Sequence, residues 1–185
     1  ENTENHGIEV VNTKRSELPI QTRNGLQKII QSGEVNLDTL LHLEHQYTEA
    51  VIEQCKMLIE SSDEKISVIG FHGQTLWHAP HLGSTLQIGF AERLAEATLT
   101  PVAHQFRRGD MARGGQGAPL APLFHASQFS RDTENVAVLN LGGIANLSLL
   151  VSGKPIKGWD LGPANTLSDI WHQIHQDKPF DYEGK

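Results

Sequence analysis

Residues 36–70 read NLDTLLHLEHQYTEAVIEQCKMLIESSDEKISVIG, and the order of their patterns points to an α/β fold. Asn36 or Asp38 is a suitable N-cap for a helix. Apolar residues then recur at helical spacing, at Leu37, Leu40, Leu41, Tyr47, Val51, Cys55, Leu58 and Ile59. The short apolar run at residues 66–70 predicts a buried strand. A helix that leads into a buried strand is typical of a parallel α/β sheet.

The flanking segments extend this alternation. We expect strands at residues 7–19, 84–89 and 100–106, and helices at residues 21–33, 90–98 and 119–129. A polar stretch at residues 130–135 then precedes a strand, a Gly-Gly turn and a strand over residues 136–151. The chain closes with a further strand, a loop and a helix. We therefore place a first α/β domain at residues 1–131 and the beginning of a second α/β domain at residues 132–185.

Composition narrows the class of protein. The 185 residues carry a formal net charge of −7, which argues against nucleic acid as the main partner. The single cysteine, Cys55, cannot form an internal disulfide, and this fits a reducing compartment such as the cytoplasm. No apolar run approaches the length of a transmembrane helix, so we expect no membrane partner.

Polar side chains gather in the segment GFHGQTLWHAPHLG, residues 70–83, which we expect to form a loop after the predicted buried strand. Ligands of α/β folds bind beyond the carboxyl ends of strands, so His72, Gln74 and Thr75 are candidate binding residues. The alternative is an ordinary turn with a satisfied histidine. His72, His78 and His81 match no standard zinc spacing, and we expect no metal ligand among them.

The segment FRRGDMARGGQGAPLAP, residues 106–122, sets three arginines around one aspartate before a run of glycines. Arg107, Arg108 and Arg113 could keep Asp110 ionised, or could bind a carboxylate or phosphate. An aspartate held in this way can accept a proton by virtue of its position. The alternative is a surface salt-bridge cluster that holds a loop.

Two further segments could bind anions. In LNLGGIAN, residues 139–146, a Gly-Gly hairpin exposes backbone N–H groups that can cradle phosphate, although a plain hairpin turn has the same sequence. In WDLGPANTLSD, residues 159–169, Asp160 ends a strand and Asn165 opens a helix whose N-terminus favours an anion, or is simply capped. A Walker A motif, a spaced set of dinucleotide-binding glycines and a nucleophile elbow are all absent from the sequence.

Taken together, GFHGQTLWHAP, STLQIG, FRRGDMARGGQGAPLAPLFH, LNLGGIANLS and WDLGPANTLSD resemble the anhydro-N-acetylmuramic acid kinase family in order and spacing. The resemblance runs from about Gly7 to the end of the chain. It implies an actin-like (ribonuclease-H-like) ATPase fold of two α/β domains, with the active site in the cleft. The implied reaction uses ATP and Mg²⁺, opens 1,6-anhydro-N-acetylmuramic acid with water, and phosphorylates O6 to give N-acetylmuramic acid 6-phosphate in peptidoglycan recycling.

The resemblance also assigns roles to residues. Asp110 matches the catalytic base that takes a proton from the attacking water. Gly142, Gly143 and Asn146 match a phosphate-binding hairpin. The residues expected to line the sugar-binding cleft are His72, Gln74, Thr75, Arg107, Arg108, Asp160 and Asn165. The implied full-length protein is a homodimer.

The chain departs from the family pattern at both ends. The family's first phosphate-binding hairpin, Gly-Thr-Ser-x-Asp-Gly, and its adenosine-binding glycine segment have no counterpart here. We therefore interpret the chain as an internal fragment that is inactive alone. Two alternatives stay open: a kinase of the same superfamily that acts on another sugar, and a sugar-binding fragment without catalysis.

Overall fold

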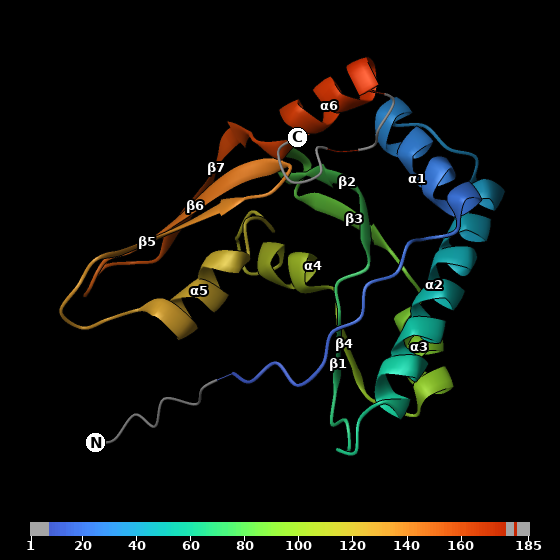
Figure 1. Ribbon diagram of the computed structural model, residues 1–185, viewed down its shortest axis with the longest axis horizontal. Helices are drawn as coiled ribbons and strands as arrows, with labels where there is room; N and C mark the ends of the chain where they lie inside the picture. Colours follow the sequence, from blue (N-terminus) through green and yellow to red (C-terminus); the bar gives the residue numbers. More distant parts are fainter. Residues whose placement is uncertain (1–7, 177–179, 181–185) are drawn as a thin grey trace. The chain divides into compact units, whose positions relative to one another are not determined.

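The computed structural model describes residues 8–176 and residue 180 (Figure 1). The chain divides into two compact units between Gly117 and Ala118. The sequence places a domain boundary later, after residue 131. Helix α5 (Ala121–Phe129) packs on strand β6 (Ile144–Leu150) and so goes with the second unit. The domain boundary at residue 131 stays a prediction.

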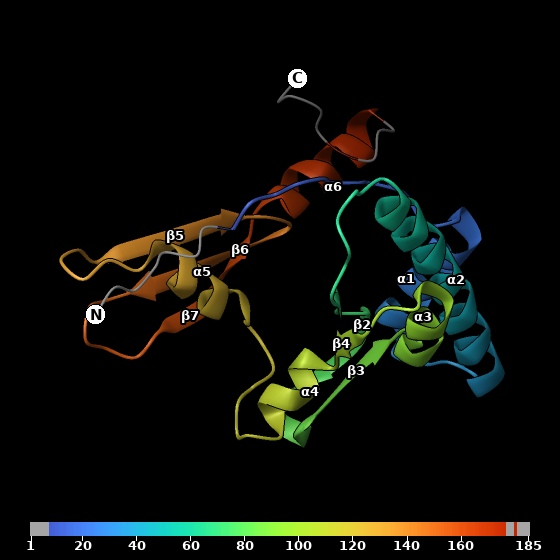
Figure 2. The same cartoon turned by 90° about the horizontal axis from the view of Figure 1, so that it is seen from below.

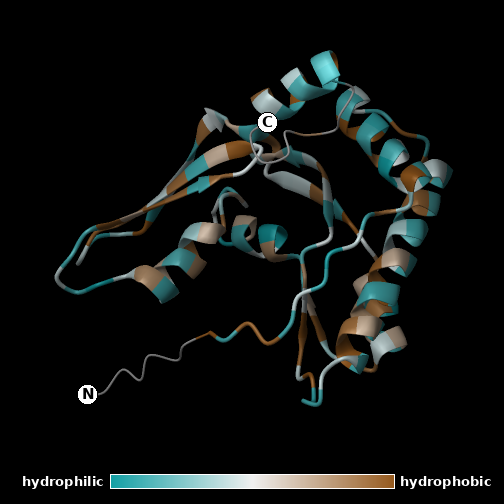
Figure 3. Cartoon of the chain, viewed as in Figure 1, coloured by the Kyte–Doolittle hydropathy of each residue, from teal (hydrophilic) through white to brown (hydrophobic). Residues whose placement is uncertain are grey.

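Two long helices begin the regular structure. Helix α1 (Ile20–Ser32) ends at Gly33, whose φ of 69° is left-handed. Helix α2 (Leu37–Glu60) begins as the sequence predicts, because the side chain of Asn36 accepts hydrogen bonds from the Asp38 and Thr39 N–H groups. Figure 3 shows hydrophobic and hydrophilic residues interspersed along α2, as expected for a helix with one buried face.

The first unit contains two small sheets. Strands β1 (Ile69–Phe71) and β4 (Val102–His104) pair in parallel, which confirms the parallel α/β arrangement. Strands β2 (Gln74–Ala79) and β3 (Ser84–Ile88) form an antiparallel hairpin across the short helix η1 (Pro80–Leu82). The prediction that residues 70–83 form a loop is therefore wrong: residues 74–79 pair with β3, and Leu76 and Ala79 are buried.

Two apolar clusters hold this unit together. Leu26, Ile29, Leu43, Leu76 and Ile88 join α1 and α2 to the β2–β3 hairpin. Ile52, Phe71, Ala91 and Leu94 join α2 to β1 and to helix α3 (Ala91–Thr98). Tyr47 packs against both clusters, and helices α1, α2 and α3 gather on one side of the strands (Figure 1). Burial of these side chains is the main stabilising contribution to the unit.

The strand predicted at residues 7–19 is not formed by residues 8–19, the part of this segment that the structure describes. Residues 8–19 form neither helix nor strand, and Ile8, Val10 and Val11 are all more than half exposed. A strand needs a neighbour for its N–H and C=O groups, and no described segment pairs with these residues. Apolar alternation alone could not supply that partner.

The second unit is an antiparallel sheet with two helices. Strands β5 (Val136–Leu141), β6 and β7 (Lys157–Pro163) lie side by side in that order, and helix α6 (Asn165–Gln176) follows (Figure 2). The predicted strand, Gly-Gly turn and strand are confirmed by the β5–β6 pairing. Helix α5 is fixed to β6 by a 2.7 Å hydrogen bond between His125 Nδ1 and the buried Ser148 hydroxyl. Both units together make a mixed α/β structure.

Candidate active site at the ends of β1 and β4

A small polar pocket of about 70 Å³ lies where the parallel strands β1 and β4 end. Its lining residues are Phe71, His72, Gly73, Gln87, Ile88, Gly89, Glu92, His104, Gln105 and Arg108. This is the edge at which α/β proteins bind ligands. The sequence pointed to His72 and Arg108 here, but missed Glu92, His104 and Gln105. The signal for His104 and Gln105 was their position near the carboxyl end of the strand predicted at residues 100–106.

Asp110 lies on a short helix rather than in a loop. Gln105 has a left-handed φ of 58°, and the chain then enters helix α4 (Phe106–Met111). The carbonyl oxygen of Asp110 accepts 3.0 Å hydrogen bonds from the Arg113 and Gly115 N–H groups, so the following turns fold back over the helix end. The Gly117 N–H donates to Asp110 Oδ2 at 2.7 Å. The chain from Asp110 to Gly117 therefore wraps around the carboxylate.

Glycine at position 115 is required by that wrapping. A Cβ atom built on Gly115 would overlap the carboxylate of Asp110, and the nearest contacts would be with both oxygens and the carboxyl carbon. The backbone can approach the carboxylate this closely only because no side chain stands between them. Gly115 thus allows the chain to close around the Asp110 carboxylate.

The three arginines do not pair with Asp110. Arg107 donates to His72 Nε2 at 2.9 Å and to the Gly117 carbonyl at 2.8 Å. Arg108 Nε donates to the Thr85 carbonyl at 3.1 Å, and Arg113 Nη1 donates to the Gly109 carbonyl at 2.9 Å. None of the ion pairs among the described residues includes Asp110. The salt-bridge cluster that the sequence offered as an alternative is therefore not formed around Asp110 by the described residues, and a backbone N–H contacts the carboxylate instead.

His72 has a defined tautomer in this arrangement. The Arg107 Nε–H can only donate, so His72 Nε2 must accept. The ring proton then lies on Nδ1, which donates to the Gly73 carbonyl at 2.8 Å. Both ring nitrogens are therefore engaged by the protein.

Gln74 and Thr75 belong to the β2–β3 hairpin. The Gln74 amide donates to the Thr75 carbonyl at 3.1 Å, and the Thr75 hydroxyl accepts from the Gln87 amide at 3.3 Å. Gln87 also donates to the buried Thr85 hydroxyl at 2.7 Å. This network stiffens the hairpin next to the polar pocket, in which Gln87 participates. The substrate-binding roles of Gln74 and Thr75 stay predictions.

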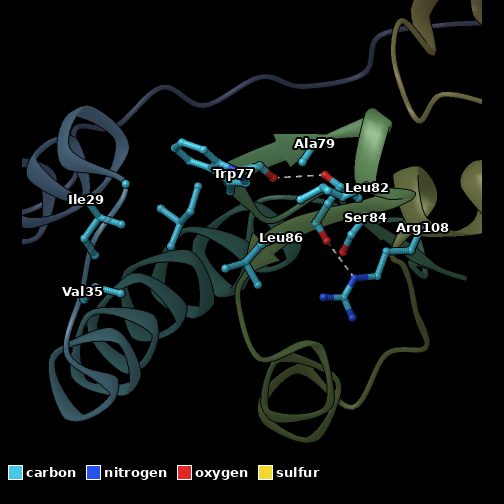
Figure 4. Close-up of a pocket in the computed structure, with 11 residues that line it drawn as sticks. Ile29, Val35, Trp77, Ala79, Leu82, Ser84, Leu86 and Arg108 are labelled. Carbon is cyan, nitrogen blue, oxygen red and sulfur yellow. Dashed lines mark hydrogen bonds between the residues drawn. The ribbon is translucent and has the colours of Figure 1, made fainter.

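Arg108 also faces a second, larger cavity of about 440 Å³ between α1 and the β2–β3 hairpin (Figure 4). Most of its lining is apolar, including Ile29, Leu76, Leu82 and Leu86. Because Arg108 lines both cavities, its guanidinium is the polar group shared by them. The bond from its Nε to the Thr85 carbonyl fixes the group there.

In the second unit, the Gly142–Gly143 turn is tied to the start of α6. The Gly142 carbonyl accepts from the Asn165 N–H at 2.9 Å, and the Gly143 carbonyl accepts from the Ala164 N–H at 2.9 Å. The Thr166 hydroxyl also donates to Gly143, at 2.8 Å. The N–H groups at the start of α6 are therefore hydrogen-bonded to carbonyls of the hairpin. This is the capping that the sequence offered as the alternative to an anion, and the binding role of Asn165 stays a prediction.

The predicted residues of the second unit separate into two groups. Asn165 donates from its side chain to the Leu141 carbonyl at 2.9 Å, so it braces the hairpin. Asn140, Asn146 and Asp160 lie directly opposite one another on β5, β6 and β7. Directly opposed residues of antiparallel strands share a face, so these three polar side chains form a row beside the hairpin. The sequence predicted that Asp160 ends a strand, but Asp160 lies in the middle of β7.

The described residues show neither of two other kinds of site. In the described part of the chain, no group of three or more His, Cys, Asp or Glu side chains is placed to hold a metal ion. None of the helices in residues 8–176 combines the length and the hydrophobicity needed to span a bilayer.

Comparison with known proteins gives a consistent result. Residues 2–185 match the family model of anhydro-N-acetylmuramic acid kinase. The anhydro-N-acetylmuramic acid kinase of Pasteurella multocida is 42% identical over 170 residues, which cover 89% of this chain and 45% of the relative. That of Bordetella petrii is 41% identical over 179 residues, covering 97% and 46%, and that of Pseudomonas putida is 38% identical over 180 residues, covering 96% and 50%. The chain spans about half the length of these curated relatives.

Proposed function

The chain belongs to the anhydro-N-acetylmuramic acid kinase family, and we propose that it supplies the catalytic base of such a kinase. The proposed reaction opens the internal 1,6-anhydro bond of anhydro-N-acetylmuramic acid with water and phosphorylates O6, giving N-acetylmuramic acid 6-phosphate for cell-wall recycling. We further propose an actin-like ATPase fold, a cytoplasmic location and a homodimeric full-length protein.

The observation that carries the proposal is the environment of Asp110. Its Oδ2 is fixed by the Gly117 N–H, and among the described residues no group donates a hydrogen bond to Oδ1. A general base must be held within hydrogen-bond reach of the proton that it removes. Oδ1 is therefore the atom that accepts the proton of the attacking water. As water oxygen bonds to C1, the bond between C1 and O6 breaks, and O6 leaves as the group to be phosphorylated.

The remaining predicted residues have proposed binding roles. Arg108 offers a fixed cation to the lactyl carboxylate of the sugar, because a guanidinium forms charge-assisted hydrogen bonds with carboxylates. Gln74 and Thr75, on the hairpin beside this pocket, are proposed to bind the sugar. Asp160 and Asn165 are proposed binding residues of the second unit. The sugar carries one charged group, the lactyl carboxylate, and Arg108 provides a cation for it in the lining of the polar pocket.

The second unit has features that fit a nucleotide phosphate and its magnesium ion. Gly142 and Gly143 lack side chains at the turn, and their carbonyls point to α6, so the turn is held rigidly. Mg²⁺ in nucleotide sites is held by one or two carboxylates and by phosphate and water oxygens, and Asp160 beside Asn146 provides one carboxylate. When bound, ATP supplies the phosphoryl group and Mg²⁺ offsets its charge.

An isotope experiment tests the function. A full-length kinase that carries these residues would be given the anhydro sugar, ATP and Mg²⁺ in H₂¹⁸O. We expect one ¹⁸O atom on C1 of the product and phosphate on O6, both located by mass spectrometry of fragments. Phosphorylation without ¹⁸O on the sugar would mean that water does not attack C1, and the proposed role of Asp110 would be lost.

A further inference from the structure

We propose that His72 and Arg107 are positioning residues that hold the Asp110 carboxylate through the backbone of Gly117. The resemblance assigned both side chains to substrate binding, but their polar atoms are engaged within the protein. This inference rests on the proposed function only for its kinetic consequence. The contacts themselves can be tested without any activity.

The first link joins two distant segments. Arg107 Nε donates to His72 Nε2 across 35 residues of sequence, at 2.9 Å. His72 can accept because its proton is on Nδ1, where the Gly73 carbonyl holds it at 2.8 Å. The chain after β1 therefore sets the direction of the guanidinium on α4. Without this acceptor, a long arginine side chain has many rotamers to choose from.

The second link runs from Arg107 to Gly117. Arg107 Nη1 donates to the Gly117 carbonyl at 2.8 Å. The guanidinium is planar and rigid, so the two hydrogen bonds fix Gly117 relative to His72. Gly117 has a left-handed φ of 75°. Glycine can adopt many other backbone conformations, so hydrogen bonds from neighbouring groups are needed to keep Gly117 in this one.

The third link is the one that matters for catalysis. The Gly117 N–H donates to Asp110 Oδ2 at 2.7 Å, so the orientation of Gly117 sets the orientation of the carboxylate. Oδ1 is then presented in one direction. Misplacement of a reacting group by about 1 Å can cost roughly 10²-fold in rate. His72 and Arg107 would therefore act on turnover, through Gly117, without touching the sugar.

Kinetics of a full-length kinase that carries these residues separate positioning from binding. We expect His72→Leu and Arg107→Met to lower kcat about 10²-fold and to leave KM within about threefold. His72→Gln should restore most of kcat, because its amide oxygen can accept from Arg107 Nε in place of Nε2. Arg113→Met is the matched control: it removes an arginine of the same segment whose guanidinium, within the described residues, bonds the Gly109 carbonyl alone, and should retain near-parental kcat.

A rise in KM with unchanged kcat for both His72→Leu and Arg107→Met would assign them to substrate binding and overturn the proposal. Equal loss of kcat in His72→Leu and His72→Gln would also overturn it, since the acceptor would then be irrelevant. Thermal unfolding of each variant shows whether a loss of kcat follows from a loss of folded protein.

A second measurement needs no activity. Nitrogen-15 NMR of the 185-residue chain reports the tautomer of His72, and we expect the proton on Nδ1 and a bare Nε2. We also expect slow hydrogen exchange of the Gly117 N–H, which becomes faster in Arg107→Met. A proton on Nε2 would overturn the positioning proposal even if the kinase is active. An inactive kinase with the expected tautomer would overturn the proposed function and leave the contacts standing.

Discussion

The Gly117 N–H and the Asp110 carboxylate are joined by a 2.7 Å hydrogen bond to Oδ2. The bond uses one carboxylate oxygen and makes the two oxygens chemically distinct. Because the donor is a backbone group, its position depends on the path of the chain and not on a side-chain rotamer. The consequences for substitutions around Asp110 follow from this difference.

Replacement of Asp110 by asparagine should keep the hydrogen bond from the Gly117 N–H and remove the catalytic base. In Asp110→Asn the side-chain oxygen can still accept from the Gly117 N–H, and the amide nitrogen then stands where Oδ1 was. That nitrogen cannot accept a proton, so turnover of a full-length kinase should fall by about 10²–10⁴-fold. The melting temperature and the affinity for the sugar should stay close to the parental values.

The control for this prediction is the same substitution at an exposed acid of the first unit away from the pocket, Asp38→Asn on α2. It should leave turnover unchanged. If Asp110→Asn retained near-parental turnover, the proton would have to go elsewhere, and Asp110 would have only a structural role.

The glycine at position 115 should be as sensitive as the aspartate. Its φ is not left-handed, so alanine is allowed by the backbone, but the new Cβ would overlap the Asp110 carboxylate. We expect Gly115→Ala to displace the carboxylate and lower turnover by about 10²-fold or more. Steady-state kinetics and the melting temperature of the variant check this.

Gly109→Ala is the matched substitution for comparison. It lies inside α4, and its Cβ would meet only Arg113 Nη1, at an ordinary distance of 3.7 Å. Alanine in a helix is more stable than glycine by roughly 0.5–1 kcal/mol. We expect Gly109→Ala to be at least as stable as the parent. Equal losses of turnover in the two variants would argue against a specific overlap at position 115.

We expect that the hydrogen bond between the Thr166 hydroxyl and the Gly143 carbonyl can be removed without unfolding the second unit. Thr166→Val removes the hydroxyl that donates to the Gly143 carbonyl, and should cost about 1 kcal/mol of stability. Thr166→Ser keeps the hydroxyl and should cost less. We expect hydrogen exchange at the Asn165 and Ala164 N–H groups to become faster in Thr166→Val only. Identical exchange in both variants would show that the hydroxyl contributes nothing to the link between the hairpin and α6.

Alkaline pH should destabilise the first unit. Burial raises the pKa of the Cys55 thiol above its ordinary value of 9.0. Burial, and to a smaller extent the neighbouring Cys55, raises the pKa of Tyr47 above 10.0. The folded chain therefore retains these protons at pH values where the unfolded chain loses them, so the free energy of unfolding falls as the pH rises through and above about 9.

Melting temperatures measured between pH 7 and pH 11 test this linkage. We expect them to decline from about pH 9, and Tyr47→Phe to lessen the decline above about pH 10, because phenylalanine has no proton to lose. A decline of the same size in Tyr47→Phe would exclude Tyr47 as a source of the effect.

Local patterns in the sequence predicted much of the fold. The Asn36 cap, the period of α2 and the Gly-Gly hairpin depend on neighbours in the chain, and each is confirmed. The strand at residues 7–19 needed a partner segment, which no local pattern reveals, and it is absent from the described residues. Strand β2 was missed because its polar residues resembled a loop, although Leu76 and Ala79 face inward.

The site shows the same limit. The sequence singled out Asp110 and the residues around it, but it paired the aspartate with arginines because opposite charges are adjacent in sequence. In the structure Arg107 reaches His72 and Gly117 instead. Arg107 precedes Asp110 by three residues, a spacing at which helical side chains can meet, but acceptors on His72 and Gly117 take up its guanidinium. Which donor meets Asp110 depends on the fold of residues 111–117.

The placement of Trp77 in the wall of the large cavity gives the chain a built-in optical reporter. The chain has three tryptophans, and the other two, Trp159 and Trp171, belong to the second unit. The Trp171 ring lies 4.1 Å from that of His175, close enough for the imidazole to quench its emission. Replacing Trp159 and Trp171 by phenylalanine would leave a fluorescence signal from Trp77 alone. The unfolding of the first unit, and any ligand that enters its cavity, could then be followed separately from events in the rest of the molecule.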